Sequence, residues 1–112
     1  VNRHDARIHA FTMTFDGSVD WGVFAVWFTL LLHSHGADVL RVKGLLRLAG
    51  APGPVVINAV QHLVHPPAHL AAWPEEWRQS RLVFIVRDIA RADIERSFAA
   101  FQSLLSAPPV AA

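Results

Sequence analysis

Three histidines lie close together in the sequence, at His62, His65 and His69. A neutral imidazole is a common zinc ligand, so this spacing suggests a zinc site. On a strand, however, alternation places His62 and His65 on opposite sides, and only a turn before Pro66 would let both contact one ion. The competing interpretation is that these are polar edge and loop histidines that bond to backbone or water.

The other reactive side chains do not form a catalytic set. His33 and His35 are two residues apart near the end of a predicted helix, so they point about 160° from one another and suit a capping and surface role. Glu75 and Glu76 are adjacent, which separates their carboxylates, and the chain contains no cysteine. We therefore expect no enzymatic activity from this chain alone and no catalytic residues within it.

A basic stripe is the second candidate site, and here the chemistry would be that of a protein interface. Arg41, Lys43 and Arg47 alternate along a predicted strand with only Leu45 between the last two, so all three can hardly be buried. Either solvent or a protein partner covers this face. Aromatic residues suitable for base stacking are not interleaved with the cations, which argues against RNA.

Composition narrows the class of protein. The length of 112 residues fits one domain. The net charge of +1 gives no strong positive electrostatic field that could bind nucleic acid. The longest apolar stretch, Val23 to Leu32, is shorter than the roughly 20 residues of a membrane span. With no cysteine, we expect a soluble, cytoplasmic domain. The apolar share of 53% predicts a surface that is buried elsewhere.

The elements that must position these residues can be predicted from periodicity. Residues 8–15 alternate as a strand, and residues 20–35 have a wide apolar stripe at helical spacing, with Gly36 placed to end the helix in a left-handed conformation. Residues 39–48 alternate again and predict a hairpin with a strand that begins at Val55. His65-Pro66-Pro67 begins a loop that continues through Trp73-Pro74.

The last two elements complete the predicted order β-α-β-β-β-α. Residues 81–87 form an apolar run typical of a central strand covered on both faces, and residues 93–105 have helical spacing before Pro108-Pro109. This order predicts a two-layer α+β domain, with a mostly antiparallel sheet of about four strands and both helices on one face. The predicted core is Phe11, Phe24, Phe28, Val42, Phe84, Ile94, Phe98 and Phe101.

Four stretches together resemble one protein family, and they occur in the same order. They are Ile8-His9-Ala10-Phe11, His35-Gly36 with Leu40-Arg41-Val42-Lys43-Gly44, Val60-Gln61-His62-Leu63-Val64-His65-Pro66-Pro67, and Ser80-Arg81-Leu82-Val83-Phe84-Ile85. The chain resembles the carboxy-terminal domain of CobW-like proteins, which are P-loop GTPases of the cobalamin synthesis protein type and are regarded as metallochaperones. The likeness runs from residue 8 to about residue 105.

The resemblance implies a domain organisation. Residues 1–112 would be a single CobW C-terminal domain, with residues 1–7 as the remnant of a linker and residues 106–112 as a flexible tail. Family members carry a GTPase domain ahead of this one, and this chain has no Gly-x-x-x-x-Gly-Lys-Ser/Thr loop. GTP and magnesium would therefore be bound only by that other domain, and we expect no cofactor in this one.

The resemblance also implies a function, namely regulation and partner recognition in zinc or cobalt delivery or in cobalamin biosynthesis. The expected partners are the protein's own GTPase domain, which would meet the face of Arg41, Lys43 and Arg47, and a client metalloprotein. Two alternatives remain open from the residues themselves. One is a small metal-binding domain built on His62, His65 and His69, and the other is a structural module that forms a homodimer.

Overall fold

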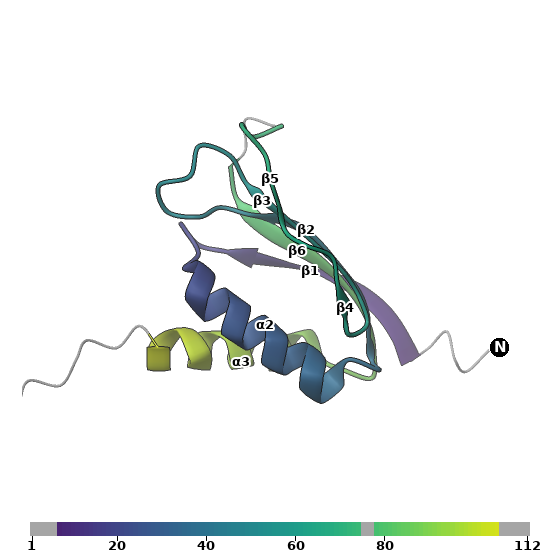
Figure 1. Cartoon of the computed structure of the whole chain (residues 1–112). Coiled ribbons are helices and arrows are strands. Elements are labelled where there is room, and N and C mark those ends of the chain that lie inside the picture. Colours follow the sequence, from purple (N-terminus) through teal and green to yellow (C-terminus); the bar gives the residue numbers. More distant parts are fainter. Residues whose placement is uncertain (1–6, 75–77, 106–112) are drawn as a thin grey trace, which may run out of the picture.

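The computed structural model of the chain describes residues 7–74 and 78–105. This part of the chain forms two layers, a sheet and a pair of helices (Figure 1). In chain order the elements are β1 (Ile8–Phe15), α2 (Trp21–His35), β2 (Val39–Leu46), β3 (Val55–Val60), β4 (Leu63–Val64), β5 (Ala68–His69), β6 (Ser80–Arg87) and α3 (Arg91–Leu105). The predicted α+β class is confirmed.

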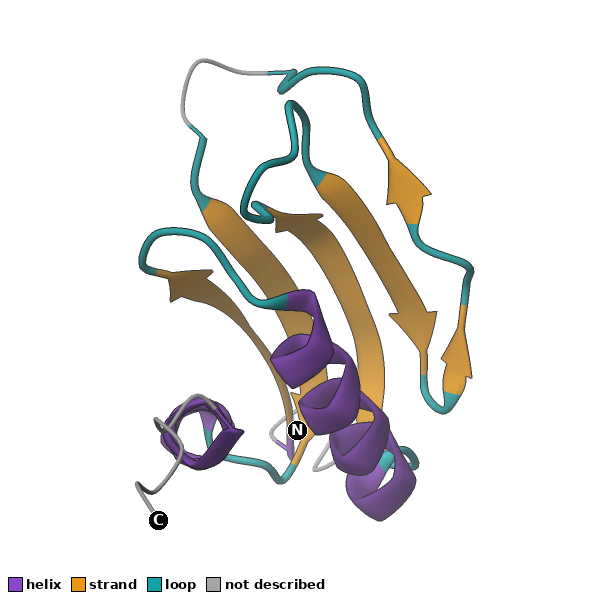
Figure 2. Ribbon diagram, turned by 60° about the vertical axis from the view of Figure 1, so that its left-hand side comes forward, coloured by secondary structure: helices purple, strands orange, loops and turns teal. Residues whose placement is uncertain are grey.

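The sheet has six strands in the order β1-β6-β2-β3-β4, and β5 also pairs with β3. Every pairing between these strands is antiparallel. The last long strand of the sequence, β6, therefore lies inside the sheet, between the edge strand β1 and the strand β2 (Figure 2). The predicted hairpin is present as β2 and β3, with Lys43 opposite Asn58.

Both helices lie against the same face of the sheet, as predicted (Figure 1). Asp20 caps α2, because its Oδ1 accepts a hydrogen bond from the Val23 amide at 3.0 Å. The two helices are tied together where the Trp27 indole Nε1 donates to Ser97 Oγ at 2.8 Å, and Ser97 Oγ in turn donates to the Ile94 carbonyl at 2.8 Å. The buried indole N–H is thus satisfied.

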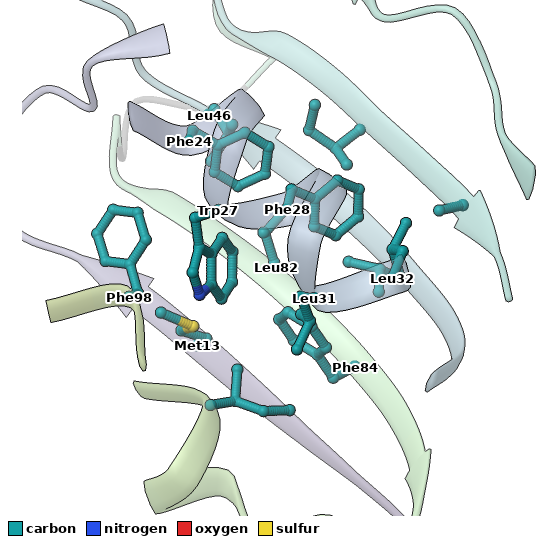
Figure 3. Close-up of a cluster of buried hydrophobic side chains, with 14 of the residues drawn as sticks. Met13, Phe24, Trp27, Phe28, Leu31, Leu32, Leu46, Leu82, Phe84 and Phe98 are labelled. Carbon is teal, nitrogen blue, oxygen red and sulfur yellow. The ribbon is translucent and has the colours of Figure 1, made fainter. Parts of the chain in front are cut away.

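The hydrophobic core fills the space between the helices and the sheet (Figure 3). Trp27 is 1% exposed and makes an edge contact with Phe98, with the ring centroids 5.1 Å apart. Of the predicted core, the following residues are buried: Phe24, Phe28, Val42, Phe84, Ile94 and Phe98. Phe11 and Phe101 are only partly buried and pack against the rim of this cluster.

Three expectations about the strands need correction. The sheet has six strands rather than about four, because the region predicted as a loop contains the two-residue strands β4 and β5. Strand β2 ends at Leu46 rather than at Leu48, since Leu48 forms a parallel bridge with Val19 instead. Strand β6 is covered on one face only, and Val83 on its other face is 43% exposed.

Two glycines are required by close approach rather than by a special backbone conformation. Gly36 has φ −58° and ψ −28°, which is right-handed, so the prediction of a left-handed helix end was wrong. A Cβ at Gly36 would lie 2.3 Å from the Leu32 carbonyl oxygen and 3.4 Å from the His62 Cβ. A Cβ at Gly44 would lie 2.0 Å from the Arg81 carbonyl oxygen, so glycine lets β2 and β6 pack closely.

Candidate functional site

The sheet face opposite the helices is the main candidate site, and we call it the open face. Strand register brings its residues into rows, because cross-strand partners point to the same side of a sheet. One row runs Thr12, Val83, Lys43 and Asn58, and the next runs Thr14, Arg81, Leu45 and Val56. A third row joins Ala10, Ile85 and Arg41. Neither helix lies over these rows (Figure 1).

Cations and aliphatic side chains alternate on the open face. Lys43 is exposed and lies beside Val83 of β6, while Arg41 is half-buried beside Ile85. Among the positions of β1, β2, β3 and β6 that point to this side in the described chain, several are basic and none is Asp or Glu. The open face therefore combines partly exposed apolar surface with positive charge.

The basic stripe predicted from the sequence is only partly on this face. Arg41 and Lys43 belong to it, but Arg47 follows the last residue of β2. The Arg47 amide donates to Ser80 Oγ at 2.7 Å, and its carbonyl accepts from the Val19 amide at 2.7 Å. Arg47 is thus an exposed residue at the junction of β2 with the loop before α2, outside the strand pairing.

Asn58 supplies an acceptor that the described part of the chain does not use. Its Oδ1 is buried and has no hydrogen-bond partner among residues 7–74 and 78–105, although Asn58 lies opposite Lys43 across the β2–β3 pairing. The Asn58 carbonyl accepts from the His65 amide at 2.9 Å, which places His65 at the outer end of the same row. An unsatisfied buried acceptor is uncommon and suits a surface that is completed by another molecule.

The three clustered histidines do not converge. His62 is in the turn between β3 and β4, His65 follows β4, and His69 is in β5 opposite Val55, and all three are exposed. Across residues 7–74 and 78–105 no group of three or more His, Cys, Asp or Glu side chains is placed to hold a metal ion. The described part of the chain therefore does not gather His62, His65 and His69 into a three-ligand metal site.

Two hollows flank the end of α2, and His33 and His35 line different ones. His35 borders a mainly apolar groove of about 180 Å³ between α2 and α3, together with Trp27, Leu31, Ile94 and Phe101. His33 borders a hollow of about 220 Å³ with His62, Thr29, Leu32 and Val64. The expected divergence of the two helix histidines is therefore present, and His33 and His62 line the same hollow.

A charged pair, Arg7 and Asp88, lies where β1 begins and β6 ends. Arg7 Nε donates to Asp88 Oδ2 at 2.7 Å, and the Asp88 amide donates to the Arg7 carbonyl at 3.0 Å. This hydrogen bond from Arg7 lowers the pKa of Asp88 below its usual value. Both side chains are exposed, so the pair fixes the strand end rather than forming a buried site.

Some predicted features lie elsewhere. Trp73 is half-buried in the loop after β5. Glu75, Glu76 and Trp77 lie outside the described residues, as do the expected tail after Leu105 and most of the expected linker before Ile8. No helix within the described residues is long and apolar enough to cross a membrane.

The open face contains residues that sequence reasoning missed. Val83 and Ile85 were assigned to a strand buried on both sides, because an uninterrupted apolar run does not distinguish burial within a chain from burial by a partner. Asn58 carried no signal beyond its place in a β-branched strand. The pairing of His33 with His62 joins residues 29 positions apart, and no sequence spacing could have indicated it.

Comparison with known proteins supports the resemblance noted above. Residues 8–102 match the family described as the cobalamin synthesis protein CobW C-terminal domain. Two solved structures match at 26% identity over 85% of this chain: the Zn(II)-bound YjiA GTPase from E. coli, with a TM-score of 0.74, and a Zn(II)-bound triple mutant of YjiA GTPase, with a TM-score of 0.75.

The match to these GTPases is confined to part of their length. The chain spans 30% of each of the two solved GTPase chains. No curated protein matched the sequence. The family match nevertheless covers most of the chain, including every strand of the sheet, all of α2 and most of α3. The chain therefore belongs to the family of CobW C-terminal domains.

Proposed function

We propose that this domain is a non-catalytic recognition module of a CobW-like GTPase, and that its open face docks on the GTPase domain of the same protein. In this role it would couple the nucleotide state to the delivery of zinc or cobalt to a client metalloprotein. GTP and magnesium would be bound by the GTPase domain alone. The observation that carries the proposal is the open face, a sheet surface of half-exposed aliphatic residues that neither helix covers.

The choice of occupant rests on the family and on charge. This chain spans only 30% of the solved GTPases that it resembles, so in them a domain of this kind is joined to a larger partner. A docking surface within one protein needs moderate apolar area with a polar margin, which matches Val83 and Ile85 beside Arg41 and Lys43. The positive charge favours an acidic surface on the partner.

The orphan acceptor of Asn58 supports docking in a second way. A buried oxygen without a hydrogen bond costs about 1–3 kcal/mol, and a donor from a docked partner would remove that cost. Lys43 lies on the neighbouring strand at the same level, so charge and hydrogen bonding would act on one part of the partner. The same row ends at His65, which extends the polar margin.

The test is a charge reversal on the open face with a matched control on the helix layer. Lys43→Glu reverses an exposed charge, so the chain should remain within about 1 kcal/mol of its original stability in a urea titration. Its affinity for the separately produced GTPase domain of the same protein, measured by calorimetry, should fall by about tenfold or more. Arg96→Glu makes the same charge change on α3 and should leave that affinity unaltered.

Several results would overturn the proposal. Equal affinities of the Lys43→Glu and Arg96→Glu variants would show that the GTPase domain does not use the open face. Loss of folding in Lys43→Glu would show that Lys43 is structural. Light scattering that finds a dimer of the original chain, converted to monomer by Lys43→Glu, would assign the face to a second copy instead.

A further inference from the structure

The hollow beside the carboxy end of α2 places two imidazoles from distant parts of the chain together. Its lining contains Thr29, Leu32 and His33 of α2, and His62 and Val64 from the β3–β4 hairpin. On a helix, positions 29, 32 and 33 share one face, so His33 points to the same side as the other α2 residues that line the hollow. Both histidines are exposed and therefore accessible to a ligand from solvent.

The β3–β4 turn is held in place against the segment that follows α2. The Gln61 amide donates to the Leu40 carbonyl at 3.3 Å, and Gln61 Nε2 donates to the Ala37 carbonyl at 3.4 Å. Gln61 has a φ of 52°, which forms the tight turn that presents His62. Figure 1 shows this turn beside the end of α2. The position of His62 is therefore set by the fold.

The distance between the two side chains can be bounded from Gly36. A Cβ at Gly36 would lie 3.4 Å from the His62 Cβ. Gly36 has helical dihedral angles, so His33 and Gly36 are neighbours three residues apart, with Cβ positions about 5–6 Å from each other. The Cβ atoms of His33 and His62 thus lie within about 9 Å of each other, a span that two imidazoles can close on one ion.

We propose that His33 and His62 form a two-histidine site for a divalent ion of the zinc type. Neutral imidazole nitrogens bind such ions at about 2.0–2.1 Å, and the hollow provides the space between the rings. Because the described chain brings no third ligand to this place, the remaining coordination positions are open to water or to a donor from another protein. An open coordination sphere suits an ion that is held transiently rather than kept.

The site deepens the metal delivery proposed above, and for its biological role it rests on that proposal. Its location is separate from the docking surface, since the hollow lies on the helix side of the hairpin and Lys43 lies on the open face. This proposed site differs from the metal site expected from the sequence, because the second ligand to His62 is His33 of α2 rather than His65 or His69.

The experiment is a titration of the 112-residue chain with Zn²⁺ alone. Calorimetry measures the affinity, and NMR monitors the histidine side chains during the titration. We expect the imidazole signals of His33 and His62 to shift. His33→Ala and His62→Ala should each lower the affinity for Zn²⁺ by about tenfold or more.

Matched controls are present in the same chain. His35→Ala removes an exposed imidazole two residues along α2, and His65→Ala removes one beyond the same hairpin, and each should change the affinity by less than about twofold. Circular dichroism checks that every variant is folded. An equal loss with His65→Ala, or no loss with both His33→Ala and His62→Ala, would refute the site. The titration omits the GTPase domain, so its outcome is independent of the docking test.

Discussion

Replacing Phe98 with alanine tests whether α3 is docked as an integral part of the core. Phe98 is 6% exposed and lies on the face of α3 that meets β1 and α2. Its ring makes edge contacts with Phe15 at 5.0 Å and with Trp27 at 5.1 Å, measured between ring centroids. Truncation therefore removes a large buried ring that joins both layers of the domain.

The expected loss can be worked out from these contacts. Truncating a buried phenylalanine to alanine costs about 3–5 kcal/mol, which includes the cavity that remains. Two edge contacts between aromatic rings place Phe98→Ala toward the upper half of that range, since each contributes about 0.5–1.5 kcal/mol beyond area burial. The Trp27 hydrogen bond to Ser97 stays in place, so no buried donor is left unsatisfied.

Urea unfolding followed by tryptophan fluorescence and by far-ultraviolet circular dichroism measures the loss. Leu104→Ala is the matched control, because Leu104 is on the same helix but is 73% exposed and should cost less than about 1 kcal/mol. A loss below about 1 kcal/mol for Phe98→Ala would refute the packing of α3. Similar losses for the two variants would mean that they report helix propensity rather than burial.

Two further predictions concern the backbone and pH. Gly44→Ala should destabilise the fold by about 2 kcal/mol or more in urea unfolding, because its Cβ would lie 2.0 Å from the Arg81 carbonyl oxygen, and an unchanged midpoint would contradict this. Asp88 has a positive φ, which asparagine tolerates, so Asp88→Asn removes the charge without new strain. Since Arg7 lowers the pKa of Asp88, the stability from the ionised pair is present above about pH 4 and is lost as the pH falls through the lowered pKa. The difference in stability between the original chain and Asp88→Asn should therefore shrink on acidification from about pH 5 to about pH 2, and a constant difference would contradict the assignment.

Much of the candidate site could not be predicted because it depends on pairings between strands. Alternation alone placed Arg41 and Lys43 on one side of β2, and the structure agrees. The same rule failed for Arg47, since β2 ends before it and its amide bonds to Ser80. The position of β6 beside β2 is what adds Val83 and Ile85 to the open face.

By itself, the sequence determined the class of fold, the bounds of the first strand and helix, most of the core and the family resemblance. These follow from local periodicity and from motifs in chain order, which need no knowledge of distant contacts. The tertiary structure alone decided which face of β6 is uncovered, and it alone joined His33 to His62. Both depend on how elements far apart in the sequence pack together, and a hydrophobic pattern records that a residue prefers burial without recording which surface buries it.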